Sequence, residues 1–403
     1  MKPVLSSLLA TMLLLSACSL PQSAKSPQPA VSQATPSPSS AASPTRSPRP
    51  PLNLFAIQRL DARVGFIAGW TGTGIPLART SDGGASWQRI NIPVSGLTAL
   101  RFIDQHVGWV SGFVDRDLAG NACQTAQPCR GVVLRTEDGG RSWQTVLSIP
   151  TDDASESIEQ IQAVDGLRAW ALTLSQGSCG STACPSELRR TTDGGRNWAT
   201  LLRGQIAAIR FASASRGWVA LADSTGNGAE VRVTSDGGAT WRSVFHTASG
   251  APYGLDAASI YTAWLLTRNG GYCTSSNCTR YELFRTGNGG LTWSSLGNPK
   301  ATAGASCAFG HLAGPLFASV SRGWLGLNLG AGGANGGSGG LLSSQDGGKT
   351  WKCATTPKNT TLISAANPLE AWVASEDRET QATSLFATED GGASWHPLTL
   401  SGL

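Results

Sequence analysis

The sequence TSDGGASW at residues 80–87 sets a pattern of residue types that occurs seven times along the chain. The shared form is Ser/Thr-x-Asp-x-Gly-x-Ser/Thr-Trp, and the copies occupy residues 80–87, 136–143, 191–198, 234–241, 286–293, 344–351 and 388–395. Two copies deviate, because Asn197 replaces the second hydroxyl residue and Asn288 replaces the Asp. We call each copy a box segment. Seven copies spaced 43 to 58 residues apart predict a repeat architecture.

The residue types of the box segment are those of a tight hairpin turn. Gly accepts a positive φ without a Cβ penalty, so Asp-Gly-Gly favours a sharp chain reversal. The carboxylate can accept N–H groups inside the turn, and the Trp begins the next strand with a large face for burial. The pattern matches the Asp-box, also called the bacterial neuraminidase repeat. We assign a structural role in the turn to the third residue of each copy, namely Asp82, Asp138, Asp193, Asp236, Asn288, Asp346 and Asp390.

A second motif, Gly-Trp or Ala-Trp, precedes six of the box segments, with its Trp at positions 109, 170, 218, 264, 324 and 372. The first repeat has Gly65 and Phe66 there instead, and Trp70 lies on the same expected strand. Together with the box Trp, these residues account for all 14 Trp of the chain. Because every Trp has a place in the repeat, we expect them to pack in the core rather than to stack on a ligand.

Each repeat is predicted to contain four strands, which in the second repeat lie at residues 97–103, 107–112, 131–136 and 142–147. Seven such repeats predict an all-β protein, a seven-bladed β-propeller with four antiparallel strands per blade over residues 52–403. The pattern begins with a first strand at residues 54–60 and ends with a fourth strand at residues 395–400. We therefore expect the ring to close by packing of the first blade on the last, without a swapped strand.

Four repeats are longer than the others because they carry insertions between the second and third strands, at residues 116–130, 175–186, 269–279 and 328–340. In a propeller these loops share one face with the connections between blades, and the box turns lie on the opposite face. The insertions are thus expected on a single face, where loops of extra length commonly carry binding functions.

The cysteines support an oxidising compartment. Three local pairs lie within insertions, and we predict disulfides Cys123–Cys129, Cys179–Cys184 and Cys273–Cys278, with Cys307 and Cys353 pairing across the sixth blade. Metal binding is the alternative interpretation of these pairs. Their spacers of five and four residues, and the four scattered His, argue against zinc. We expect no metal site.

The N-terminus is typical of an exported lipoprotein. Residues 1–17 contain a short apolar stretch after Lys2 and end in Leu-Ser-Ala before Cys18, which resembles the bacterial lipobox. Acylation of Cys18 would anchor the protein to membrane lipid. Residues 18–51 are rich in Ser and Pro and are predicted to form a disordered tether. We expect an exported monomer on the outer face of the bacterial cell membrane or within the cell envelope.

The charge distribution argues against nucleic-acid binding. The chain carries 31 Lys and Arg against 26 Asp and Glu, and four of the basic residues precede residue 52, so the predicted propeller is nearly neutral. Five of the seven turns between first and second strands nevertheless carry a basic residue. These residues form a candidate anion or partner patch on the face of the box turns, consisting of Arg63, His106, Arg168, Arg216 and Arg322. Solvated turn charges are the alternative interpretation.

Asp-box folds include sialidases and other glycosidases, so a catalytic function has to be weighed. Such hydrolysis needs two carboxylates about 5 to 9.5 Å apart, or a Tyr nucleophile in sialidases. The Phe/Tyr-Arg-Ile-Pro motif of sialidases is absent, and all four Tyr lie between the fourth and fifth box segments. The acids at residues 152–159 and 376–379 are typical of solvated loops. We expect no enzyme activity, no catalytic residue and no cofactor.

A lipobox, a tether and seven Asp-box blades with Gly-Trp strands resemble the photosystem II assembly factor family over residues 54–400. The resemblance implies a non-catalytic propeller that binds a protein partner at the membrane surface as an assembly or stability scaffold. The disulfide-stapled insertions depart from the family pattern, and no arginine of the family is carried over to this chain. The alternative is a carbohydrate-binding or sialidase-like surface lipoprotein that takes a glycan.

Overall fold

The computed structural model describes residues 52–71, 74, 77–114, 130–149, 156–175, 186–269, 280–300, 311–328, 340–354, 357–377, 380 and 382–400. All of them belong to the second of two compact units, Arg49–Leu403, and the first unit is Met1–Pro48. The predicted signal peptide, Cys18 and the tether lie outside the described residues. So do nearly all residues of the four predicted insertions.

Every strand in the described residues belongs to one of seven four-stranded sheets, which we number as blades one to seven in chain order. Blades one to four contain β1 (Asn53–Arg59), β2 (Gly65–Trp70), β3 (Leu77–Thr80), β4 (Gln88–Ile90), β5 (Gly96–Phe102), β6 (Gly108–Val114), β7 (Arg130–Thr136), β8 (Gln144–Ser148), β9 (Glu156–Ala163), β10 (Ala169–Ser175), β11 (Ser186–Thr191), β12 (Ala199–Gly204), β13 (Ile206–Phe211), β14 (Gly217–Ala222), β15 (Ala229–Thr234) and β16 (Arg242–Thr247). Blades five to seven contain β17 (Ala251–Ala257), β18 (Ala263–Asn269), β19 (Arg280–Thr286), β20 (Ser294–Ser295), β21 (His311–Phe317), β22 (Gly323–Asn328), β23 (Leu341–Ser344), β24 (Lys352–Ala354), β25 (Thr360–Ala365), β26 (Ala371–Glu376), β27 (Thr383–Thr388) and β28 (His396–Leu398).

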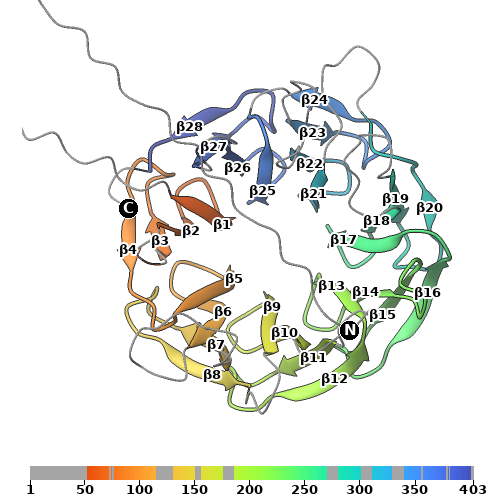
Figure 1. Cartoon of the computed structure of the whole chain (residues 1–403), viewed down its shortest axis with the longest axis horizontal. Coiled ribbons are helices and arrows are strands. Elements are labelled where there is room, and N and C mark those ends of the chain that lie inside the picture. Colours follow the sequence, from red (N-terminus) through yellow and green to blue (C-terminus); the bar gives the residue numbers. More distant parts are fainter. Residues whose placement is uncertain are drawn as a thin grey trace, which may run out of the picture. The chain divides into compact units, whose positions relative to one another are not determined.

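The blades stand around a ring with the first strand of each blade innermost and the fourth outermost (Figure 1). Each blade consists of four strands that are consecutive in the sequence and pair antiparallel, so the predicted seven-bladed propeller is confirmed. Among the strands that the structure describes, none is exchanged between the first and last blades, and β1 instead packs on β25 and β26.

The ring closes through hydrogen bonds between blades one and seven. The buried guanidinium of Arg59 donates to the carbonyls of Ala371, at 3.3 Å, and Thr388, at 3.0 Å. The indole Nε1 of Trp87 donates to the carbonyl of Thr399 at 3.0 Å. Trp143 and Trp198 make equivalent bonds to the preceding blade, so blade seven contacts blade one in the same way as blade one contacts blade two and blade two contacts blade three.

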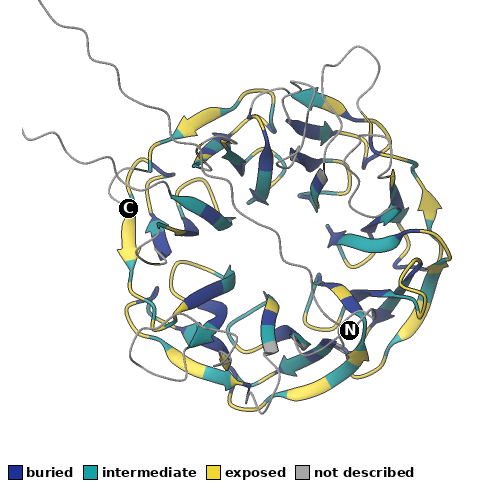
Figure 2. Ribbon diagram, in the orientation of Figure 1, coloured by how far each residue is buried: buried dark blue, intermediate teal, exposed yellow. Residues whose placement is uncertain are grey.

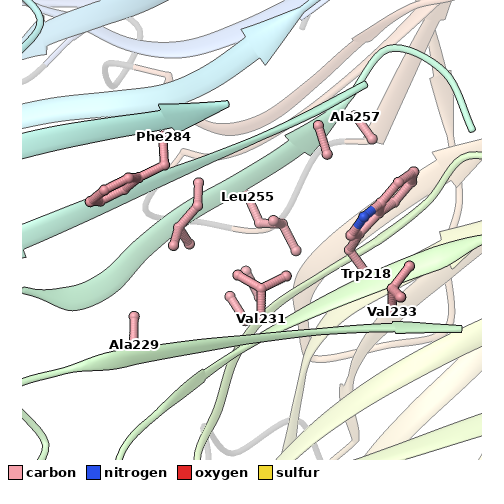
Figure 3. Close-up of a cluster of buried hydrophobic side chains, with 11 residues drawn as sticks. Trp218, Ala229, Val231, Val233, Leu255, Ala257 and Phe284 are labelled. Carbon is pink, nitrogen blue, oxygen red and sulfur yellow. The ribbon is translucent and has the colours of Figure 1, made fainter. Parts of the chain in front are cut away.

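The hydrophobic core is divided into layers between adjacent blades. Second strands are buried along most of their length because both faces are covered, whereas fourth strands are largely exposed (Figure 2). Figure 3 shows the layer between blades four and five, where Trp218 and Val231 face Leu255 and Ala257. All six Trp of the second motif are fully buried, as expected.

One Trp departs from that expectation. Trp70 is 52% exposed at the end of β2, although we expected every Trp to pack in the core. The reason is its register: Trp70 is the last residue of the strand and pairs with Asn53 at the start of β1, beyond the layers that the neighbouring blades cover.

In blades two to seven the last residue of the first strand pairs with the Gly or Ala that precedes the buried Trp of the second strand, and the sizes of these two residues are matched. In blades two, four and six the first strand ends in Phe102, Phe211 and Phe317, and the paired residue is Gly. In blades three, five and seven both members of the pair are Ala. A Cβ at Gly217 would overlap the ring of Phe211, which stacks on Trp170 of blade three at 3.7 Å between ring centroids. The volumes at this paired position are therefore complementary.

Candidate binding surfaces

The seven box segments form turns with one shared set of hydrogen bonds. In blade four, Asp236 Oδ1 accepts the N–H of Thr240 at 2.9 Å and the hydroxyl of Thr234 at 2.7 Å, and Oδ2 accepts the hydroxyl of Thr240 at 2.6 Å. Thr234 Oγ1 in turn accepts the N–H of Gly238. Both glycines of every box segment have a positive φ, which explains why Gly is needed at these two positions. Both oxygens of the carboxylate therefore accept hydrogen bonds from within the turn.

These hydrogen bonds hold the box carboxylates in their ionised form. In blade three, the backbone and side-chain amides of Asn197, followed by the hydroxyl of Thr191, lower the pKa of Asp193 to about 2. The Ser or Thr that closes the turn lowers the pKa of Asp82, Asp138, Asp236 and Asp390 further. A carboxyl group with such a pKa is a poor general acid or base near neutral pH.

Blade five differs because an amide stands in place of the carboxylate. Asn288 Oδ1 accepts the N–H of Thr292 at 3.0 Å, as an Asp would. Its Nδ2, however, donates to the hydroxyl of Thr292 at 2.8 Å, so the direction of that bond is reversed relative to the box turns with Asp. The turn keeps its shape while it loses a negative charge and frees the Thr292 hydroxyl hydrogen.

The box turns and the turns between first and second strands lie on the same face of the ring. In every blade the first box glycine donates its N–H to a carbonyl of that other turn, as Gly237 does to Ser215 at 2.8 Å and Gly289 to Tyr261 at 2.7 Å. In the turns between first and second strands, a side-chain oxygen accepts backbone N–H groups. In blade three, Asp165 Oδ1 accepts the N–H groups of Leu167 and Arg168. We call this surface the box face. Trp70 lies at the opposite end of β2 and therefore on the other face.

The five residues of the predicted basic patch all lie in turns of the box face, but in different settings. Arg63, His106 and Arg168 are exposed, and Arg168 pairs with Asp165 at 2.7 Å. Arg216 is half-buried, donates to the carbonyl of Gly289 in the next blade and lies 5.4 Å from the centre of the Trp218 ring. Arg322 is also half-buried. Their grouping into one patch stays a prediction.

Arginines that reach the box turn of the next blade were not predicted from the sequence. The residue before the box segment is Arg at positions 79, 135, 190 and 285, and Arg190 donates to the carbonyls of Asp236 and Gly237 in the next blade. Blade four has Val233 at that position, and Arg216 reaches the corresponding turn of blade five instead. The Arg directly before four of the box segments is the signal in the sequence for these contacts between blades.

A groove lies on the box face between blades four and five. Its lining is Ser213, Ser215, Arg216, Ser235, Arg242, Ile260, Tyr261, Asn288, Gly289 and Leu291. Tyr261 is 61% exposed and Leu291 is 70% exposed, so large apolar side chains stand at its rim. Burial, followed by the neighbouring Arg242, lowers the pKa of Arg216.

Charged side chains nearer the ring axis link the first strands of adjacent blades. Arg210 Nε lies 2.8 Å from Asp256 Oδ1, and the other Asp256 oxygen accepts the N–H of Phe317. Arg101 Nε donates to the carbonyl of Ala163 at 3.4 Å. Burial, followed by the like charge of Arg210, lowers the pKa of Arg101 to about 10, so it remains a cation at neutral pH. These contacts join blade two to blade three, blade four to blade five and blade five to blade six.

The described residues contain no cluster of three or more His, Cys, Asp or Glu that could hold a metal ion. They also contain no helix long and apolar enough to cross a membrane. Seven of the eight predicted disulfide cysteines lie outside the described residues: Cys123, Cys129, Cys179, Cys184, Cys273, Cys278 and Cys307. Cys353, half-buried on β24, does not carry a free thiol. The disulfide pairings stay predictions.

Comparison with family models and with curated protein sequences gives no match for this chain. Solved structures with a similar fold include YCF48 bound to D1 peptide, with a TM-score of 0.51 and 19% identity over 80% of this chain and 90% of that one. A polysaccharide lyase, the PL25 ulvan lyase bound to an oligosaccharide of GlcA and Rha3S, has a TM-score of 0.50 and 11% identity over 85% of this chain and 95% of the lyase. The Pyrococcus horikoshii acylaminoacyl peptidase has a TM-score of 0.57 and 9% identity over 86% of this chain and 52% of its own. At these identities the likeness shows the fold alone.

Proposed function

We propose that this protein is a non-catalytic scaffold that binds a protein partner through the box face of its propeller. The observation that carries the proposal is the one-sided distribution of exposed apolar side chains. Of the seven large exposed hydrophobic residues among the described ones, six stand on turns of the box face: Leu167, Ile260, Tyr261, Leu291, Val320 and Leu369. Exposed apolar groups gathered on one side of a soluble domain are typical of protein interfaces.

The chemistry of the box face supports binding over catalysis. The acids repeated on this face are committed to their turns, and their lowered pKa makes them unsuitable for proton transfer near neutral pH. The likeness to YCF48, whose solved structure holds a D1 peptide, supports a peptide or protein as the ligand and a role in assembly or stability. Enzymes share the same fold, so the fold itself does not decide between these functions.

Location forms a further part of the proposal. From the predicted lipidation at Cys18, the predicted disordered tether over residues 18–51 and the predicted disulfides in the insertions, we infer that the propeller is anchored outside the cytoplasm on a lipid surface. In this arrangement the tether lets the box face reach a membrane protein nearby. Mass spectrometry of the mature N-terminus tests this part independently, because an unmodified Cys18 would contradict it.

A glycan-binding function is the second candidate, and Trp70 is the observation that favours it. Its indole is 52% exposed on the face opposite the box turns, and an exposed aromatic ring is a suitable surface for a sugar. The ulvan lyase with its bound oligosaccharide shows that this fold can accommodate a glycan in another protein.

The two functions are separated by affinity purification with the full-length lipidated protein from detergent-solubilised membranes, run beside a glycan array. Substitution of Tyr261→Ser together with Leu291→Ser should reduce the recovered partner at least about fivefold, since a central apolar contact is commonly worth more than 1 kcal/mol. Trp70→Ser, on the other face, serves as the matched control and should leave recovery unchanged. Equal recovery with both variants, combined with glycan binding that Trp70→Ser abolishes, would favour the second candidate and overturn the first.

A further inference from the structure

The groove between blades four and five has a composition that the rest of the repeat does not explain. Its lining contains two guanidinium groups, an amide and three Ser, but no carboxylate. Asp236, in the adjacent box turn of blade four, directs both carboxylate oxygens to Thr234 and Thr240. The groove is therefore a local site of positive charge on a face that carries an acid in every other box turn.

The one box turn without an Asp is the turn that lines the groove. Asn288 is the position where six of the seven box segments have Asp, and it lines the groove. The turn does not need the amide for its shape, because an Asp in the other blades accepts the same backbone N–H and bonds the same hydroxyl, only with the hydroxyl as the donor. The substitution changes the charge of the groove and leaves the fold as it is.

Two contacts hold the side chain of Arg216 in place. Its guanidinium donates to the carbonyl of Gly289 in blade five and lies over the ring of Trp218, which belongs to the buried layer between these blades (Figure 3). Arg242 is exposed at the start of β16. Burial, followed by the like charge of Arg242, lowers the pKa of Arg216, so the two cations lie close enough to interact. A hydrogen-bonded, half-buried cation beside an exposed one suits an anionic group that both can contact.

Apolar side chains complete the rim. Tyr261 and Leu291 are mostly exposed, and Ile260 is 41% exposed. A free inorganic anion would leave this apolar surface in water, whereas an acidic residue flanked by large apolar residues would cover it. The groove thus matches a peptide segment by charge and by hydrophobicity at the same time.

We propose that the groove between blades four and five binds an acidic peptide segment, with a carboxylate directed to Arg216 and Arg242 and neighbouring apolar side chains against Ile260, Tyr261 and Leu291. This inference rests on the proposed scaffold function and names the chemistry of the partner segment. The loss of the acid at Asn288 removes a repulsion that the repeat would otherwise place in the site. Replacing Asn288 by Asp should therefore remove binding without harm to the fold.

The test uses two fluorescein-labelled peptides, GSGLDFLGSG and GSGLNFLGSG, which differ only in a carboxylate and an amide. Fluorescence anisotropy with the full chain should show that the wild type binds the Asp peptide at least about fivefold more tightly, because charge-assisted hydrogen bonds are stronger than neutral ones. Asn288→Asp and Arg242→Gln should each abolish that preference. Asp346→Asn makes the opposite exchange in the box turn of blade six, outside the groove, and should leave both affinities within about twofold as the matched control.

Several outcomes would overturn this inference. A wild type that does not discriminate between the two peptides contradicts the carboxylate site, and an Asn288→Asp variant that keeps the preference contradicts its location. If a sulfated oligosaccharide displaces the labelled Asp peptide more effectively than unlabelled Asp peptide does, the ligand of the groove is a glycan and not a peptide. The scaffold function fails separately, when recovery of the membrane partner does not depend on Tyr261 and Leu291.

Discussion

At the scale of single residues, the box carboxylate is a structural group whose charge matters. It accepts bonds from the amide and side chain four positions later, and its pKa falls because those bonds favour the ionised form. A carboxyl group with a folded pKa below its unfolded value stabilises the fold above the unfolded pKa, and that contribution disappears as the pH falls through the folded pKa.

Asp193→Asn should therefore lower the urea midpoint of unfolding at pH 7, and the deficit relative to the wild type should shrink between pH 4 and pH 2, where the Asp193 carboxylate becomes protonated. Asn288→Asp should show the reverse, with a gain in stability near neutral pH that is lost in acid. Urea titrations at pH 7, 4 and 2 measure both effects. A deficit for Asp193→Asn that stays constant over this range would mean that the carboxylate charge contributes nothing.

At the scale of elements, blade packing follows a rule of complementary volumes that the repeat motif conceals. Phe pairs with Gly in blades two, four and six, and Ala pairs with Ala in blades three, five and seven. Gly217→Ala should destabilise the protein by about 1–3 kcal/mol, because the added Cβ overlaps the Phe211 ring.

Phe211→Ala alone should cost about 3–5 kcal/mol by leaving a cavity beside Trp170. The double variant recreates the Ala pair of blades three and five, so its cost should be smaller than the sum of the two single costs by at least about 0.5 kcal/mol. Chemical denaturation of the four proteins completes the cycle. Strict additivity would show that the two positions do not share space.

The sequence predicts the repeat well because the box segment is a local structure. Two glycines, one acid and one hydroxyl define the turn within eight residues, and the strands between turns follow from the period. Contacts between blades are less predictable, since Arg190 and Arg216 reach the next blade from different positions in the repeat. Trp70 shows the same limit, because its exposure depends on where the neighbouring blades end and not on its own strand pattern.

The candidate site could be predicted only in part. The basic turn residues are visible in the sequence, but the pairing of Arg216 with Arg242, Tyr261 and Asn288 requires two blades to be placed side by side. The exchange of Asp for Asn at position 288 was visible as a deviation from the repeat, and its meaning depends on what surrounds it.

At the scale of the whole molecule, stability depends on closing the ring between blades one and seven. Arg59 is buried and donates to two carbonyls of blade seven. Arg59→Met should destabilise the protein by about 1–3 kcal/mol, because buried carbonyls lose their donors while the apolar volume is largely kept. Thermal unfolding measures this cost, and Arg63→Met, at an exposed turn position of the same blade, is the matched control. Equal melting temperatures for the two variants would contradict the role of Arg59 in closing the ring.

The most direct test of the central claim, that the box face is the partner surface, is site-specific photo-crosslinking of the full-length protein in its host. With the crosslinker at Leu291 we expect one discrete protein adduct, and the same adduct should disappear when Asn288→Asp is introduced into that chain. The crosslinker at Trp70, on the opposite face, should give no such adduct. An adduct formed from Trp70 and not from Leu291 would contradict the account.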